Sequence, residues 1–263
     1  MPTPQHAAQP ASAPASRPEV SIYWKPGCSS CLKLKEFVED LGIPFESVNM
    51  SEQPERMEEI TAAGFRGVPI VRRGDTYSYA QSLDDVAALL GVSRSRHRLP
   101  QDTLIERWEQ ILNAARAVVQ SFSEDMLTRP AIIMRDRPIK DLCSHVFQIP
   151  EAFMKTVDDG IADTRELTTA RAEIVTRDQL LAYVDAALER YREWRRLGRD
   201  RAIPERLTTF YGNQPSSLVL ERAVWHSAQH ARQLDVIAAG SGAEYQIPPA
   251  LYEGLPMPKR LWM

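Results

Sequence analysis

The stretch Lys25-Pro-Gly-Cys28-Ser-Ser-Cys31 decides how the first third of this 263-residue chain is interpreted. It follows a run of β-branched and aromatic residues at 20–24, which is typical of a strand. Apolar residues then recur at helical spacing over 32–41, before a glycine that ends the helix. Cys28 is therefore expected at a helix N-terminus, where the dipole and the free backbone N–H groups stabilise a thiolate. Lys25 adds positive charge nearby, and Cys31, one turn later, is placed to attack a mixed disulfide on Cys28.

A redox-active pair is the interpretation that we favour for these two cysteines. A zinc half-site is the alternative, but it needs a second pair of ligands. Residues 19–92 contain no other C-x-x-C motif and no pair of histidines. The whole chain has three cysteines, too few for a disulfide framework. This usage suits a reducing compartment, so we expect a cytoplasmic location.

The residues around the pair alternate between strand and helix patterns. Further strands are expected over 45–48 and 68–71, with a turn at 73–75 leading into a short fourth strand. Helices are expected over 55–63 and 84–90. The order βαβαββα predicts a thioredoxin-like α/β domain over 19–92. Val68-Pro69 falls where this fold carries a cis-proline facing the cysteines, and an X–Pro bond is the only one that adopts cis at low cost.

The motifs K-P-G-C-S-S-C and G-V-P-I-V together resemble glutaredoxins and the related NrdH-type redoxins over residues 19–92. The resemblance implies that Cys28 is the nucleophile and that Cys31 resolves the mixed disulfide. It places Lys25, Val68 and Pro69 around the pair as supporting residues. A small-molecule thiol or disulfide is then the expected substrate.

One departure from the family concerns glutathione. Glutaredoxins usually carry a Gly-Gly pair and an acidic residue after the third strand, and these hold glutathione. Residues 77–82 read Y-S-Y-A-Q-S instead, followed by Asp84 and Asp85. We therefore expect only weak coupling to a low-molecular-weight thiol such as glutathione, with a protein reductase or thioredoxin-type donor as the other source of electrons.

The second part of the chain is dominated by long amphipathic segments. A linker is expected at 93–100, and helices over 102–121, 138–158, 177–197 and 215–239. Four long helices predict an all-α four-helix bundle over 101–263. The proline-rich residues 247–263 are expected to form a non-helical strap over the bundle. Residues 1–18, rich in Ala, Pro, Ser and Gln, are expected to be a disordered tail.

Three of the five histidines fall on predicted helices of the bundle. His226 and His230 are four residues apart, so they share one helix face with apolar neighbours. His145 lies on the second long helix in a similar pattern. Burying such imidazoles is costly unless a partner satisfies them. A divalent metal with three nitrogen ligands and one open position would do so; hydrogen-bonded core histidines are the alternative.

The sequences D-L-C-S-H-V-F, containing His145, and W-H-S-A-Q-H-A-R-Q-L, containing His226 and His230, resemble the DinB/YfiT-like bundles. The metal triad of that family is one His on the second helix and H-x-x-x-H on the fourth. The closing L-P-M-P-K-R-L-W resembles its C-terminal strap. The resemblance implies a divalent ion, zinc or nickel, that activates a thiol or a water. It also implies kinship with transferases and isomerases that use mycothiol or bacillithiol.

Two functional hypotheses follow. In the first, the bundle is a metal- and thiol-dependent transferase or isomerase for a small electrophile or thiol conjugate, served by the redox domain. In the second, the bundle only recruits a partner or forms a homodimer. We favour the first because the triad is complete, and we expect the two domains to be separate. A net charge of −3 argues against nucleic acid, and no stretch approaches the roughly 20 apolar residues that span a membrane.

Overall fold

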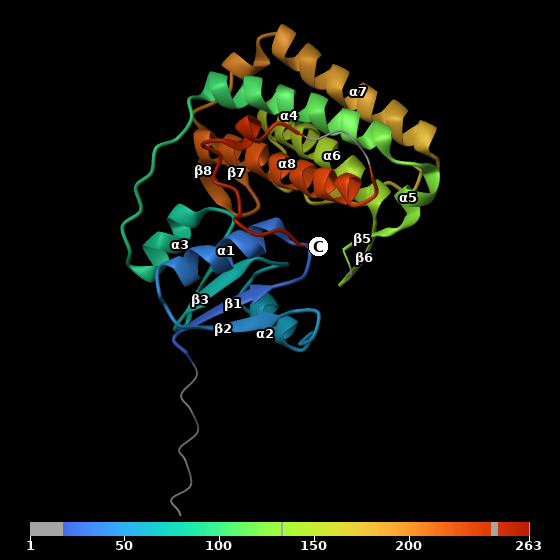
Figure 1. Cartoon of the computed structure of the whole chain (residues 1–263). Coiled ribbons are helices and arrows are strands. Elements are labelled where there is room, and N and C mark those ends of the chain that lie inside the picture. Colours follow the sequence, from blue (N-terminus) through green and yellow to red (C-terminus); the bar gives the residue numbers. More distant parts are fainter. Residues whose placement is uncertain (1–17, 133, 243–246, 263) are drawn as a thin grey trace, which may run out of the picture.

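The computed structural model describes residues 18–132, 134–242 and 247–262. All but the last residue of the tail expected at 1–18 lies outside these residues. Figure 1 shows an α/β domain, residues 19–92, lying against a larger helical region, residues 101–262. None of the described helices is long and apolar enough to cross a membrane.

The α/β domain has the element order that the sequence predicts. It consists of β1 (Val20–Trp24), α1 (Ser29–Asp40), β2 (Phe45–Asn49), α2 (Arg56–Ala62), β3 (Ile70–Arg73), β4 (Thr76–Tyr79) and α3 (Leu83–Leu90). The sheet order is β2-β1-β3-β4, with β1 parallel to β2 and antiparallel to β3. This arrangement confirms the thioredoxin-like fold. Strand β3 begins at Ile70 rather than residue 68, in keeping with Pro69, which has no N–H to donate to a neighbouring strand.

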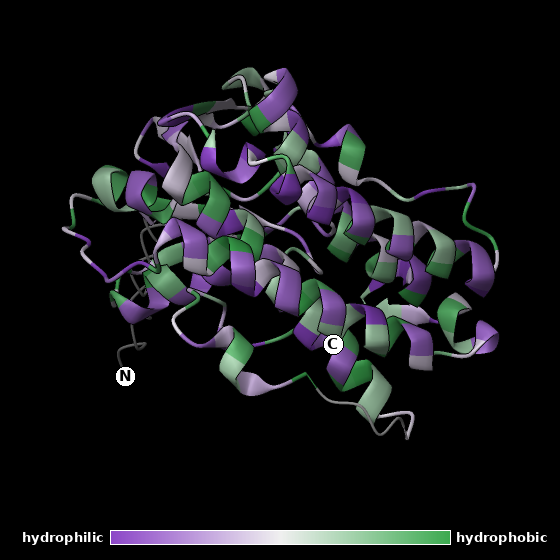
Figure 2. Ribbon diagram, turned by 90° about the horizontal axis from the view of Figure 1, so that it is seen from above, coloured by the Kyte–Doolittle hydropathy of each residue, from purple (hydrophilic) through white to green (hydrophobic). Residues whose placement is uncertain are grey.

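The helical region contains four long helices: α4 (Gln101–Ser121), α6 (Ile139–Asp159), α7 (Arg177–Arg196) and α8 (Ser216–Ala239). Helices α7 and α8 each pack against both α4 and α6. Together they enclose one apolar core, in which Trp108, Phe147 and Tyr191 are fully buried. Figure 2 shows hydrophobic and hydrophilic residues alternating along the long helices, as helices with one buried face require.

Several smaller elements were not predicted. A short helix α5 (Glu124–Thr128) and a hairpin of β5 (Pro130–Ile132) and β6 (Arg135–Pro138) connect α4 to α6. Three-residue 3₁₀ turns follow α6 and α7, at Glu166–Thr168 and Arg199–Arg201. A second hairpin of β7 (Arg206–Thr209) and β8 (Gly212–Pro215) precedes α8. The expectation of a wholly non-helical C-terminal strap is wrong, because Pro249–Tyr252 form a 3₁₀ helix; proline is well suited to a first helical turn.

The linker residues 93–100 hold the two parts of the chain together through charged side chains. Arg94 and Arg98 both form ion pairs with Asp84 of α3. Arg96 pairs with Glu221, a buried residue of α8. The linker is therefore bound to both parts of the chain along its length.

The last residues of the chain cross back to the α/β domain. The backbone N–H groups of Lys259 and Arg260 donate to the carboxylate of Glu36 on α1, at 2.7 and 2.9 Å. The Trp262 indole stacks on Trp24, with ring centroids 5.5 Å apart. The two parts of the chain are thus in direct contact: α1 packs against α8, and the chain joins the two parts at both ends of the helical region.

Candidate redox and metal site

Cys28 and Cys31 form a disulfide at the start of α1. Cys28 is the N-cap of the helix, and its Sγ accepts a hydrogen bond from the Cys31 N–H at 3.1 Å. Cys28 is half-buried, whereas Cys31 is fully buried. Only Cys28 can therefore be reached by a substrate, which suits the roles predicted for the two cysteines.

The loop before Cys28 packs closely against the helical region. Gly27 has φ +75°, and a Cβ there would lie 2.8 Å from Cδ1 of Ile132 in hairpin β5–β6. Lys25 lies near Arg135 and Arg137 of the same hairpin, and its pKa is lowered by partial burial and by these two cations. The Val68–Pro69 peptide bond, predicted as a supporting element, is cis.

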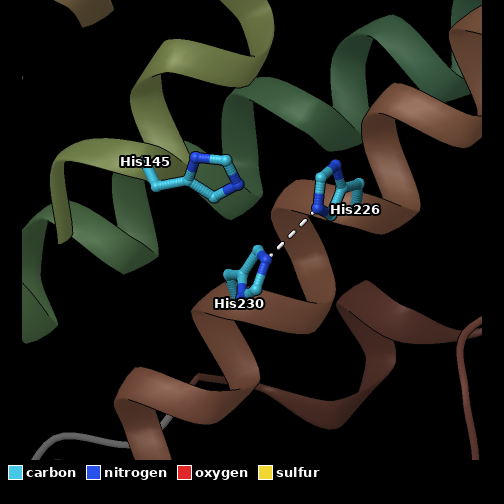
Figure 3. Close-up of side chains that lie close together, drawn as sticks. All are labelled: His145, His226 and His230. Atoms are coloured by element: carbon cyan, nitrogen blue, oxygen red, sulfur yellow. Dashed lines mark hydrogen bonds between the residues drawn. The ribbon is translucent and has the colours of Figure 1, made fainter. Parts of the chain in front are cut away.

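The structure brings the three predicted histidines together from two helices. His145 extends from α6 toward His226 and His230 on α8 (Figure 3). The candidate ligand atoms of the three side chains all lie within 4.8 Å of one another. The Nε2 atoms of His226 and His230 are 3.2 Å apart.

Neighbouring groups fix the tautomers of two of these imidazoles. The Nε2 of Gln233 donates to the Trp262 carbonyl at 2.7 Å, so its Oε1 faces Nδ1 of His230, 3.2 Å away. Nδ1 of His145 lies 3.2 Å from the Thr168 carbonyl, which can only accept. Both Nδ1 atoms therefore carry the proton, and both Nε2 atoms keep their lone pairs, as is usual for metal-binding histidines.

The cysteine loop and the histidine cluster line the same cavity, which has a volume of about 450 Å³. Cys28, Val68 and all three histidines are among its lining residues. Ser29, which directly follows Cys28, lies with its Oγ 3.4 Å from Nε2 of His230. The cysteine pair and the histidine cluster thus line one cavity.

Comparison with known proteins identifies the family of the α/β domain. The model of the glutaredoxin family matches residues 20–77. The glutaredoxin-like protein NrdH of Lactococcus lactis subsp. lactis is 34% identical over 56 residues, which are 21% of this chain and 78% of that protein. The chain belongs to the glutaredoxin family.

Other relatives match over a similar length. NrdH of Escherichia coli strain K12 is 38% identical to the chain over 56 residues, which are 21% of this chain and 69% of that protein. The N-acetyl-S-hydroxy-L-cysteine reductase of Bacillus subtilis is 34% identical over 62 residues, covering 22% of this chain and 66% of the enzyme. The residues matched by the family model all lie in the α/β domain, which we now call the glutaredoxin domain. No solved structure is significantly similar to the chain.

The glutaredoxin domain uses the segment after β4 to contact the helical region. Gln81 accepts hydrogen bonds from Arg222 of α8, and Asp85 accepts one from Gln214 of β8 at 2.8 Å. Asp84 is held by the linker arginines. This segment is where the Gly-Gly pair of typical glutaredoxins is missing, and here its polar side chains are occupied by other parts of the same chain.

The electrostatics of the histidine cluster favour the neutral imidazoles that a metal needs. Burial is the largest cause that lowers the pKa of His145 and His226 well below 6.5, and nearby cations and imidazoles add to it. The pKa of His230 is lowered to about 3, again chiefly by burial and then by Arg137. All three side chains are therefore neutral at physiological pH.

The geometry of the cluster fits a divalent ion. Two nitrogens bound to a tetrahedral metal at about 2.0–2.1 Å are about 3.3 Å apart. The Nε2 atoms of His226 and His230 are 3.2 Å apart, and a third ligand atom from His145 lies close by. Three imidazoles, two of them with fixed tautomers, suit zinc or nickel better than the oxygen-preferring ions.

Several residues of the site were not predicted from the sequence. Ser29, Arg222 and Gln233 sit within one or a few residues of predicted site residues, but nothing in their spacing indicated a contact across the chain. Arg135 and Arg137 lie in a segment between helices where no element had been predicted. The alternating R-D-R-P run before α6 was the only signal that could have indicated a strand there.

Proposed function

We propose that this chain is a thiol–disulfide oxidoreductase in which Cys28 and Cys31 serve a metal- and thiol-dependent enzyme site in the helical region. The observation that carries the proposal is the shared cavity, in which the Cys28 loop faces the three histidines. The contact between Ser29 and His230 supports it, because it places the redox loop directly against the cluster.

The redox step follows from the exposure of the two sulfurs. Reduced Cys28, as the thiolate, attacks one sulfur of a substrate disulfide and releases the other half as a thiolate. Buried Cys31 then loses its proton and attacks Cys28 Sγ, which frees the second half of the substrate. The chain is left with the Cys28–Cys31 disulfide, and two thiols have been formed.

We further propose that the helical region is a DinB/YfiT-like four-helix bundle with a transferase or isomerase activity on a small electrophile or thiol conjugate. His145, His226 and His230 would hold one zinc or nickel ion. When bound, such an ion acts as a Lewis acid that activates a thiol or a water. The position of His145 on α6, and of the other two on α8, supports this proposal.

The reductant and the location are proposed on chemical grounds. With the polar side chains after β4 occupied by Arg222, Gln214 and the linker, a thioredoxin-type reductase is a better electron donor than glutathione. The Bacillus subtilis relative is named for the reduction of a small S-oxidised cysteine derivative, which agrees with a small-molecule substrate here. A reducing compartment, the cytoplasm, suits this redox pair.

Metal content measured beside disulfide reduction tests the proposal. We expect one divalent ion per chain after reconstitution with zinc or nickel, and its loss in H230A. H97A, which changes an exposed histidine of the linker, is the matched control and should keep the metal. C28S should keep the metal but lose disulfide reduction, and C31S should trap a mixed disulfide. A metal-free wild type, or undiminished metal in H230A, would reduce the cluster to core histidines and favour a recruiting or dimerising role for the bundle.

A further inference from the structure

The cavity that joins the redox pair to the histidine cluster has a cationic lining. Its cationic side chains come from both parts of the chain and are Lys25, Arg66, Arg135, Arg137, Arg165 and Arg222. Arg165 is ion-paired with Asp163, but no aspartate or glutamate of the described residues lines the cavity itself. A recess lined by charges of one sign concentrates ligands of the opposite sign.

Arg222 of α8 lies beside the histidine cluster and has only neutral partners among the described residues. Its guanidinium donates to the Gln81 side-chain oxygen at 2.8 and 2.5 Å and to Ser30 Oγ at 3.4 Å. Burial lowers its pKa. These partners hold the side chain in place without neutralising its charge.

The hairpin β5–β6 supplies two further arginines without a carboxylate partner in the described part of the chain. Arg137 donates to the backbone carbonyl of Asp141 at 3.2 Å. Burial, and then Arg135, lowers the pKa of Arg137 to about 10. A desolvated cation of this kind is unfavourable until an anion binds beside it.

Arginines elsewhere in the helical region are arranged differently. Many of them form ion pairs with carboxylates, including Arg190 with Glu151, Arg195 with Glu109, and Arg196 with Glu193. The basic run at the end of α7 is therefore largely neutralised. Arg137 and Arg222, which lie where the redox loop meets the histidines, have no such carboxylate partner among the described residues, and this points to a ligand that supplies the missing charge.

We propose that this cavity binds a small disulfide or thiol conjugate carrying at least two carboxylates, with Arg137 and Arg222 as the carboxylate-binding residues. Two anionic groups are inferred because the arginines come from different elements, hairpin β5–β6 and helix α8, on the wall of one cavity. Guanidinium groups bind carboxylates in a bidentate manner. The volume of about 450 Å³ lies within the range of about 300–1,000 Å³ found for small-molecule sites. The inference rests on the proposed function, in which Cys28 reacts with the bound sulfur.

Arg137 and Arg222 both belong to the helical region, so this region, rather than the glutaredoxin domain, selects the substrate. The redox chemistry is that given above: each turnover reduces one disulfide to two thiols and oxidises the two cysteines, and dithiothreitol can restore the dithiol in an assay. Arg137 and Arg222 take no part in electron transfer. They hold the carboxylates so that the sulfur of the substrate reaches Cys28.

A charge series of matched disulfides tests the inference. Dithiodipropionate, bis(2-hydroxyethyl) disulfide and cystamine have chains of similar length around the disulfide and carry two negative charges, none and two positive charges. We expect kcat/KM of the full chain to be highest for dithiodipropionate and lowest for cystamine. R137Q and R222Q should each lower the ratio of kcat/KM for the dianionic substrate to kcat/KM for the neutral substrate about tenfold. This is the effect expected for the loss of a charge-assisted hydrogen bond.

Two controls separate local binding from net charge and from misfolding. R196Q removes one charge from an exposed ion pair at the end of α7 and should leave the ratio unchanged. R137K keeps the charge and should restore part of the preference. An unchanged ratio in both R137Q and R222Q, or an equal preference for cystamine in the wild type, would overturn the inference.

A ligand that binds but cannot react shows whether the inference or the proposed function has failed. Suberate has the length of dithiodipropionate but no disulfide, so it reports on the arginines alone. We expect calorimetry to show suberate binding to the wild type and to C28S, and weaker binding to R222Q. If suberate binds but no disulfide is reduced, the proposed function fails and the inference stands. If disulfides are reduced without a charge preference and suberate does not bind, the inference fails alone.

Discussion

Cys28 and Cys31 differ in exposure although they are three residues apart and share one disulfide. The half-buried sulfur caps a helix and lies near a lysine, whereas the other sulfur is enclosed in the fold. The three histidines, in contrast, do not differ much in exposure, because all of them lie in one buried or nearly buried cluster. Position in the fold thus sets the accessibility of the cysteines and of the histidines, and the burial of the histidines should make the stability of the chain depend on pH.

The free energy of unfolding should fall as the pH is lowered from 6.5. The folded-state pKa of each clustered histidine lies below the 6.5 of a free imidazole, and that of His230 is about 3. The unfolded chain therefore takes up protons first, so the stability present above pH 6.5 is lost progressively as the pH falls toward the folded pKa. The slope should approach about 1.4 kcal/mol per pH unit for each histidine.

Urea denaturation in the presence of a chelator, at several pH values between 7.5 and 5, measures this slope. The variant H145Q/H226Q/H230Q removes the three titrating groups and should show a shallower dependence on pH. H97Q, changed at an exposed histidine, serves as the control. Equal slopes for the wild type and the triple variant would contradict the pKa shifts.

At the scale of elements, the sequence predicted regular segments well and hairpins poorly. The glutaredoxin domain and the four long helices follow from hydrophobic periodicity, and the C-x-x-C and H-x-x-x-H spacings lie within single helix faces. The strands of hairpins β5–β6 and β7–β8 have only three or four residues, which is too short for periodicity to identify them. The contact between Ser29 and His230 joins residues far apart in sequence and depends on docking, which periodicity does not report.

The C-terminal strap should slow hydrogen exchange in the redox loop, residues 25–31. The indole Nε1 of Trp262 donates to the Cys28 carbonyl at 3.1 Å, and the ring stacks on Trp24. W262A removes both contacts and is expected to lower the free energy of unfolding by about 1–2 kcal/mol. Backbone amides of residues 25–31 should exchange faster with deuterium.

W262F is the matched variant for this prediction, because it keeps an aromatic ring over Trp24 but cannot donate to Cys28. We expect its exchange rates to lie between those of the wild type and W262A. Unchanged exchange over residues 25–31 in W262A would show that the strap does not hold the loop.

At the scale of the whole molecule, charged contacts between the linker and the helices are one of the ways in which the two parts of the chain are held together. Arg96 pairs with Glu221, whose side chain is only 4% exposed. Breaking a buried pair by removing one partner costs more than the pair contributes, because the remaining charge stays desolvated. This pair joins the linker to α8, next to the cavity that both parts of the chain share.

E221Q should therefore destabilise the chain by about 3 kcal/mol. E193Q is the matched control, because it changes one partner of an exposed ion pair with Arg196 and should cost less than about 1 kcal/mol. Chemical denaturation of the two variants side by side gives the difference. Equal stabilities would mean that Arg96 finds another partner when Glu221 is neutral.

The Cys28 loop and the histidine cluster line one cavity. This arrangement has a consequence for the kinetics of any reaction in which both take part. Reactive groups held on one chain meet at an effective concentration on the order of millimolar or higher, far above that of two dilute proteins. In the proposed function, a substrate disulfide bound beside the histidines reaches Cys28 of the same chain. Its reduction is then a first-order process within the bound complex, so dilution of the protein should leave the turnover of each chain unchanged.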